Sequence, residues 1–207
     1  MKGLRHFLFG CVAATGMLQG LHAQDSAATA TNMRVYQSLA ASMADSAAGL
    51  VPAADSPRVA VHIAPADVAW FLQDAVERPF RTKGFRISAN DSGAYGMEFG
   101  AVGMKVRYAN VRRNGIFGAR VLDRSVVLTA RIRIVDRARG SLLLSGERES
   151  SYEDTIPLSQ VEVIEHAAVP ATRGTLPPED FFSGLVEPLV IVGAVAVAIF
   201  LLFTVRS

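Results

Sequence analysis

The sequence has little cysteine, little histidine and no excess of one charge, and each shortage excludes a class of function. It contains one cysteine, Cys11, and 21 basic against 19 acidic side chains, so no large positive charge is available to hold nucleic acid. His62 and His166 lie in separate segments without a second ligand at metal spacing. No phosphate-binding glycine loop, serine-hydrolase motif or zinc-protease motif occurs. We therefore expect no catalytic residues, no cofactor, no metal site and no nucleic-acid partner.

Residues 1–23 have the layout of a secretory signal peptide. Lys2 and Arg5 precede a short apolar stretch, and the small Ala23 stands ahead of polar residues. We expect cleavage after Ala23, which removes the one cysteine and leaves the exported chain without thiol or disulfide chemistry. Lipoprotein processing at Cys11, which follows a lipobox-like tripeptide, is the alternative.

A second long apolar run lies near the C-terminus. Residues 188–205 carry no charge over 18 positions. A helix of that length rises ~27 Å, close to the hydrocarbon thickness of a bilayer. We predict a transmembrane helix over 185–205 and a cytoplasmic stub, 206–207, with a buried core helix as the alternative. Together with the signal, this predicts a single-pass protein of the bacterial inner membrane whose domain faces the periplasm.

Residues 24–56 are expected to form a helix and a linker ahead of the main domain. Apolar side chains recur three and four positions apart from Tyr36 to Leu50, a spacing typical of an amphipathic helix. Asn32 is expected to cap its first turn. The proline-containing run before Arg58 predicts the linker.

Residues 57–153 predict the exported domain, which opens as a βαβ unit. Alternating apolar residues from Val59 to Ile63 indicate a strand, and the helical spacing that follows indicates a helix that Pro79 kinks or ends. Gly84 provides the helix stop before another short strand. Strand, helix and strand at this spacing predict two parallel strands joined by a crossover helix.

The second half of this domain predicts an antiparallel meander. Long alternation begins at Tyr95, and Asn114-Gly115 predicts a tight hairpin turn before alternation resumes. The fold class is therefore α+β, with a mixed sheet, helices on one face and one C-terminal transmembrane helix. Residues 154–184 hold several prolines and predict an extended stalk that joins the domain to the membrane.

The stretch from Arg58 to Ser88 has a short apolar strand, a helix and a strand that opens on Gly-Phe. In this pattern it resembles the small α/β domains of bacterial envelope-assembly proteins such as the curli-secretion-type lipoproteins. The resemblance includes no functional motif, so it implies no site residues. The chain departs from that family at its C-terminal apolar segment and in its lack of a lipid-bearing cysteine.

Charge is segregated along the chain although the total is nearly balanced. Residues 105–139 carry ten basic and two acidic side chains, whereas residues 147–187 carry nine acidic and two basic ones. Arg107, Arg112 and Arg113 have no obvious acidic partner across the predicted hairpins. They are therefore the candidate residues for binding an envelope protein or an anionic envelope component.

Other basic side chains are expected to form a solvated ladder of ion pairs. If the apolar positions of the last two strands pair, Arg131 and Arg133 lie on the opposite face within reach of Glu147 and Glu149. Pairs of this kind stabilise a sheet weakly and need no ligand. This interpretation competes with a basic platform for an anionic partner.

Aromatic side chains offer a different kind of site. Trp70, Phe71, Phe80, Tyr95 and Phe99 could line a pocket beneath the helices for a lipid or another small ligand. The competing interpretation is that Trp70 and Phe71 simply belong to the hydrophobic core.

We expect a membrane-anchored exported domain that acts as an envelope binding or scaffolding module without catalysis. A lipid or small-ligand carrier or sensor is the alternative. A third hypothesis is a cell-envelope hydrolase that uses carboxylates such as Asp67, Asp74 or Glu98. The sequence leaves the partner and the oligomeric state open.

Overall fold

The computed structural model describes residues 29–52, 57–88, 90–115, 118–178 and 186–204. The predicted signal peptide, residues 1–23, and the predicted stub, residues 206–207, lie outside these ranges.

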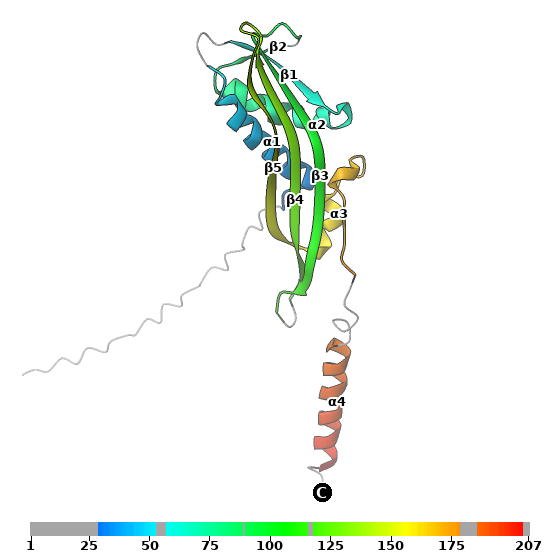
Figure 1. Cartoon of the computed structure of the whole chain (residues 1–207). Coiled ribbons are helices and arrows are strands. Elements are labelled where there is room, and N and C mark those ends of the chain that lie inside the picture. Colours follow the sequence, from blue (N-terminus) through cyan, green and yellow to red (C-terminus); the bar gives the residue numbers. More distant parts are fainter. Residues whose placement is uncertain (1–28, 53–56, 89, 116–117, 179–185, 205–207) are drawn as a thin grey trace, which may run out of the picture.

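One mixed sheet forms the centre of the domain (Figure 1). Its strand order is β2-β1-β3-β4-β5, and β6 pairs with β3 beside this path. The strands are β1 Arg58–Ala64, β2 Arg86–Ser88, β3 Tyr95–Arg113, β4 Arg120–Asp136, β5 Ser141–Pro157 and β6 Gly174–Thr175. β1 runs parallel to β2 and β3, whereas β3, β4 and β5 form an antiparallel meander. The predicted α+β class, with a βαβ start and a meander, is confirmed.

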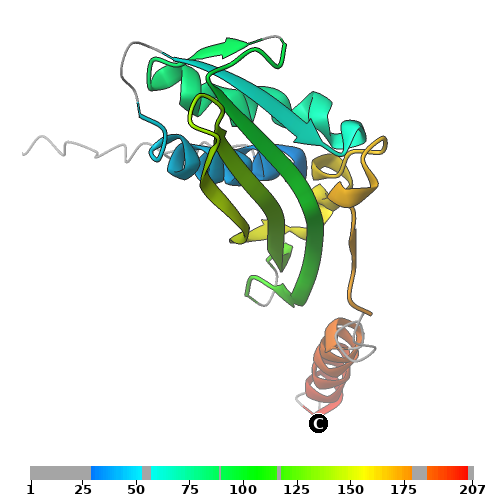
Figure 2. The same ribbon diagram turned by 45° about the horizontal axis from the view of Figure 1, so that its top comes forward.

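Two long helices, α1 (Asn32–Ala48) and α2 (Ala66–Thr82), cover one face of the sheet. α1 packs on β4 and β5, α2 packs on β1 and β2, and the helices pack on each other. Figures 1 and 2 show both on the same side of the strands. The side chains of β4 that face them are buried at alternate positions, as its period of two predicted: Leu122, Val126, Leu128, Ala130, Ile132 and Ile134.

The end of α2 is set by Gly84 and not by Pro79. Gly84 has a φ of +87°, and its N–H donates to the carbonyl oxygen of Arg81, while Phe85 N–H donates to that of Phe80. These two bonds form a Schellman motif, and the Phe80 and Phe85 rings pack edge to face at 5.8 Å. Pro79 lies inside the helix. The prediction of a stop at Gly84 is confirmed, and Pro79 does not end the helix.

The loop between β3 and β4 is longer than the sequence predicted. Pairing ends where Arg113 meets Arg120, so residues 114–119 connect the strands. Asn114 N–H donates to the carbonyl oxygen of Ala119 at 3.0 Å, and Gly115 has a φ of +81°. Gly115 therefore supplies a left-handed residue within a wider loop, and the two-residue hairpin turn predicted at Asn114-Gly115 is wrong.

The predicted stalk, residues 154–184, does not extend away from the domain over its described first part. β5 runs to Pro157, and the chain then folds back through η1 (Leu158–Gln160), α3 (Val161–Ile164), η2 (Pro170–Thr172) and β6. Val161, Ile164 and Val169 are buried in the core cluster. Apolar side chains placed between the prolines make this segment a packed part of the domain, and the prolines mark its turns. α1 belongs to the same domain, because it packs on the sheet.

The last helix, α4, comprises Val186–Thr204. Among the residues that the structure describes, no helix is long and apolar enough to cross a membrane. The transmembrane part of the predicted fold is therefore not supported here and stays a prediction.

A buried arginine joins β4 to β5 and to the start of α1. The side chain of Arg124 is fully buried, and its Nε and Nη2 atoms donate to the Asp154 carboxylate at 2.8 and 2.6 Å. Its Nη1 donates to the Ala30 carbonyl oxygen at 2.7 Å and to Asn32 Oδ1 at 2.9 Å. The guanidinium carbon also lies 5.8 Å from the centre of the Tyr152 ring. Every face of this buried cation therefore has a partner.

Asn32 carries the same network to the C-terminal segment. Its Nδ2 donates to Tyr108 Oη at 2.9 Å and to the Thr172 carbonyl oxygen at 2.7 Å. Tyr108 Oη in turn donates to Glu165 Oε1 at 3.0 Å, and the same oxygen accepts the N–H of Gly174 at 2.9 Å. Burial raises the pKa of Tyr108 to about 12. Tyr108 thus remains a neutral donor throughout the physiological pH range.

Asn32 was predicted to cap α1, and this prediction is wrong. The cap is Thr31, whose hydroxyl oxygen accepts the N–H of Arg34 at 3.3 Å. Asn32 is the first helical residue and is completely buried, because its amide is needed inside the network.

Arg124→Ala is expected to lower the free energy of unfolding by about 3 kcal/mol. This is the lower end of the cost of breaking a buried ion pair, because Asp154 is 24% exposed. Arg131→Ala is the matched control, because its pair with Glu147 is exposed and its loss should cost about 0–1 kcal/mol. Urea unfolding of the full chain measures both, and equal losses would contradict the role given to Arg124.

Candidate functional site

The side of the sheet opposite α1 and α2, here called the open face, carries alternating charged side chains. Because paired residues share a face of a sheet, the register places His62 beside Glu98, and Glu98 beside Arg133. Two positions further along, the bare backbone of Gly100 lies beside Arg131. The open face therefore combines ion-pairing groups with a position on β3, Gly100, that has no side chain.

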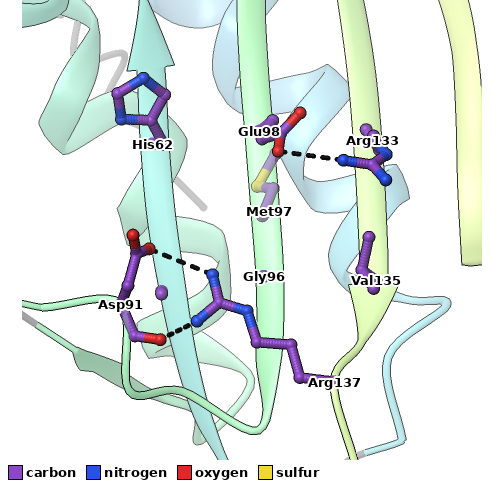
Figure 3. Close-up of a pocket in the computed structure, with 9 residues that line it drawn as sticks. His62, Asp91, Gly96, Met97, Glu98, Arg133, Val135 and Arg137 are labelled. Atoms are coloured by element: carbon purple, nitrogen blue, oxygen red, sulfur yellow. Dashed lines mark hydrogen bonds and ion pairs between the residues drawn. The ribbon is translucent and has the colours of Figure 1, made fainter. Parts of the chain in front are cut away.

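A pocket of about 370 Å³ opens on this face at the end nearest the β4–β5 turn. Figure 3 shows most of its lining: Ala60, His62, Asp91, Gly96, Met97, Glu98, Arg133, Val135 and Arg137. These residues come from β1, β3 and β4 and from the turns that precede β3 and follow β4.

Two ion pairs hold the walls of the pocket together. Arg133 Nη1 donates to Glu98 Oε1 at 3.2 Å across β3 and β4. Arg137 Nη2 donates to Asp91 Oδ1 at 3.1 Å, and its Nη1 donates to the backbone carbonyl oxygen of Asp91. Within the described part of the chain, no hydrogen bond or ion pair engages the ring of His62, which projects from β1 on the same side (Figure 3).

Gly96 forms the floor beneath Arg137. A Cβ built at this position would lie 2.9 Å from Arg137 Nε, so the guanidinium rests directly on the backbone of β3. Gly93 is even more constrained, because its Cβ would meet Ala60 N at 2.6 Å and Arg58 O at 2.9 Å. These two glycines let the Asp91 turn and Arg137 close one end of the pocket.

The lining can hold a polar group, and it contains no serine, threonine, cysteine or lysine. Its two arginines face two carboxylates, so the walls are balanced in charge apart from His62. Across the residues with described positions, no group of three or more His, Cys, Asp or Glu side chains could hold a metal ion. The arrangement suits recognition through hydrogen bonds and charge pairing.

Of the three arginines predicted to bind a partner, Arg107 alone remains without a described ion pair. It is exposed on the open face, beside Ser125. Arg112 Nη1 pairs with Asp123 Oδ1 at 2.8 Å, so the expectation that it lacks a partner is wrong. Arg113 is also engaged within the chain. The β3–β4 register is irregular between Ala109 and Arg112, and simple alternation along the strands does not predict this irregularity. The partner of Arg112 was therefore not predicted.

The predicted ladder of ion pairs forms in part, because Arg131 has its expected partner and Arg133 does not. Arg131 Nη2 lies 3.6 Å from Glu147 Oε2, as expected. Arg133 pairs instead with Glu98 on the other neighbouring strand. Glu149 accepts from a threonine hydroxyl on β4.

Five aromatic residues were predicted to line a ligand pocket beneath the helices. None of them lines the pocket on the open face. Phe71, Phe80 and Phe99 are buried in the core, and Tyr95 is 9% exposed. Trp70 is 59% exposed, which contradicts its interpretation as a core residue. Its ring lies 5.4 Å from that of Phe71 and 6.2 Å from that of His166.

The candidate carboxylates of the hydrolase hypothesis are separated by the sheet. Asp67 and Asp74 lie on α2, whereas Glu98 points to the open face. Asp74 is held by Arg78 and Arg81 on the solvent side of that helix.

Sequence reasoning missed most of the pocket. Asp91 and Arg137 are 46 positions apart in the sequence, His62 lies further still from Arg137, and only the strand register brings the three together. The sequence holds only weak signals of this site: a glycine follows Asp91 and Arg137 within three positions, and Gly96 interrupts an alternating strand.

No family model matches the chain, and no curated protein matches it significantly. Among solved structures, a minor lipoprotein from Acinetobacter baumannii is 14% identical with a TM-score of 0.31, covering 52% of this chain and 71% of that one. A lipoprotein from Neisseria meningitidis is 12% identical with a TM-score of 0.29, covering 68% and 97%. Likenesses of this size assign neither a fold nor a function to the chain.

Arg112→Ala is expected to raise the pKa of Asp123 from about 2 towards its ordinary value. Hydrogen bonds from Asn110, Arg112 and Thr155 lower this pKa, and the variant removes the second of them. The lowered pKa stabilises the fold above pH ~4, and this contribution disappears as the pH falls towards 2. NMR titration of the side-chain carboxyl measures the change. Arg131→Ala should leave it unaltered, and an unmoved pKa in Arg112→Ala would refute the pairing.

Proposed function

We propose that the protein is a membrane-anchored, exported domain of the bacterial envelope that binds or scaffolds another envelope component. In this proposal the domain faces the periplasm, a single C-terminal helix holds it at the inner membrane, and the role is binding without catalysis.

The observation that carries the binding role is the contrast between the two faces of the sheet. One face is filled by α1, α2 and the hydrophobic core, while the open face presents the long strands β3, β4 and β5 to solvent. The buried Arg124 network holds this platform rigid from behind. Binding groups on a rigid sheet lose little conformational entropy when a partner docks.

Mixed charge on the open face favours a protein partner over a uniformly anionic one. Arginines alternate with carboxylates across the strands, as in the pairs Arg133–Glu98 and Arg131–Glu147. Arg107 is the one predicted binding residue that adds an unpaired positive charge among the described residues of this face. A protein surface with both signs of charge matches this pattern best.

The sequence and α4 support the anchor. Residues 188–205 contain no charge, and the segment 1–23 has the layout of an export signal. The described side chains of α4 are exposed and are mostly large and apolar: Leu189, Val190, Ile191, Val192, Val195, Val197, Ile199, Phe200, Leu201, Leu202 and Phe203. A helix that is apolar all round needs an apolar environment, which a bilayer supplies.

The carrier hypothesis has less support. Phe71, Phe80 and Phe99 fill the core that a carrier would need to leave open, and Trp70 points away from it.

Deleting residues 186–207 is expected to release the protein from the membrane fraction. In a bacterial host, the full chain should resist alkaline carbonate extraction, because its apolar segment stays within the bilayer. An alkaline phosphatase fused after residue 178 should be active, and the same fusion without residues 1–23 should be inactive. Extraction of the full chain by carbonate, or an inactive fusion with the signal present, would contradict the proposal.

A photoreactive residue on the open face is expected to crosslink to a partner in intact cells. Ser125 and Val127 on β4 are partly exposed on that face and suit the replacement. Gln73, exposed on α2, is the matched position on the opposite side of the molecule. Discrete products should form from the two β4 positions alone. Products of equal yield from Gln73, or none from β4, would remove the open face as the binding surface.

A further inference from the structure

The long strand β5 forms a free edge of the sheet. It stands last in the strand order and, in the described part of the chain, pairs with β4 alone. No residue from 141 to 155 is buried, and no described strand pairs with the outer side of β5. Its outward backbone N–H and C=O groups are therefore available to pair with an added strand.

The edge is unusually long, and the one irregularity in its pairing with β4 lies near its start, at Leu143. β5 has 17 residues, whereas ordinary strands have about five or six. Its one proline, Pro157, stands at the very end, so every residue before it retains its N–H. Natural proteins commonly block edges with short strands, internal prolines or covering segments. Beyond the irregularity at Leu143, β5 is protected by charge alone.

That charge has one sign on the open face. Glu147, Glu149 and Glu153 all point to this side, since they pair with open-face residues of β4. Glu147 has a long ion pair, Glu149 accepts one hydrogen bond from a threonine, and Glu153 has no ion pair to a described residue. The one basic residue of the strand, Arg148, lies on the other side, opposite Ala130. The edge thus presents a row of glutamate side chains that can each accept further hydrogen bonds or ion pairs.

A second copy of the chain fits this edge poorly. In a two-fold antiparallel pair, residues at equal distances from the axis lie opposite each other on one face. If the two-fold axis passes beside any residue from 147 to 151, near the middle of β5, a glutamate of one copy lies opposite a glutamate of the other. Like charges placed directly across strands are destabilising.

We propose that β5 is a docking edge for an extended strand of a partner protein with basic residues at alternate positions. The added strand continues the sheet through backbone hydrogen bonds, and its lysine or arginine side chains face Glu147, Glu149 and Glu153. This inference rests on the proposed binding role and names the chemistry of the partner.

The test uses the full chain in a neutral detergent and a fluorescent peptide of about ten residues with alternating lysine and threonine. A peptide with glutamate in place of lysine is the matched probe. The first should bind and protect the β5 amides from hydrogen exchange, and the second should bind far more weakly.

Two double variants separate edge pairing from general attraction. Glu149→Lys/Glu153→Lys should weaken binding of the lysine peptide about tenfold and strengthen binding of the glutamate peptide. Asp67→Lys/Glu162→Lys changes the same net charge at exposed sites on α2 and α3 and should leave both affinities unaltered.

Three results would overturn the inference. The first is an equal loss of peptide affinity in the two double variants. The second is peptide binding that leaves the β5 amides unprotected from hydrogen exchange, and the third is protection of these amides in a dimer that forms without peptide. The assay needs neither the membrane nor the natural partner. Its failure is therefore distinguishable from failure of the anchor or of the open-face crosslinks.

Discussion

The buried guanidinium of Arg124 is the interaction on which the rest of the domain depends. A cation without solvent is tolerable only when every donor is satisfied, and here the partners come from distant segments. Asp154 lies on β5, and the Ala30 carbonyl and the Asn32 amide lie at the start of α1. Through Asn32 and Tyr108 the network also reaches the C-terminal segment. The two ends of the domain therefore pack on the sheet as one unit.

This arrangement uses one face of the sheet for stability and leaves the other open to solvent. The helices, the core and the polar network all lie on the first face. The open face carries exposed ion pairs, which contribute little to stability. The strand order places β5 last in the sheet, so in the described part of the chain it pairs with β4 on one side alone.

Local patterns predicted the fold well, and the site poorly. The βαβ start, the meander and the stop of α2 at Gly84 each depend on side chains near one another in sequence. The sequence predicted a stalk over residues 158–175, because prolines stand within and on both sides of this segment and the buried Val161 and Val169 show no regular period. The pocket was not predicted, because the register between β1 and β3 is what brings His62 next to Glu98, and the sequence alone does not give that register.

The sequence by itself determined which residues alternate, where α2 stops and which strands turn back on each other, because these depend on backbone preferences and periodicity. Only the tertiary structure decided that Asn32 serves a buried network instead of a helix cap. It also decided that Arg112 is held by Asp123 and that Trp70 faces solvent. Each of these outcomes depends on which distant atoms arrive beside a side chain, and no local pattern encodes that.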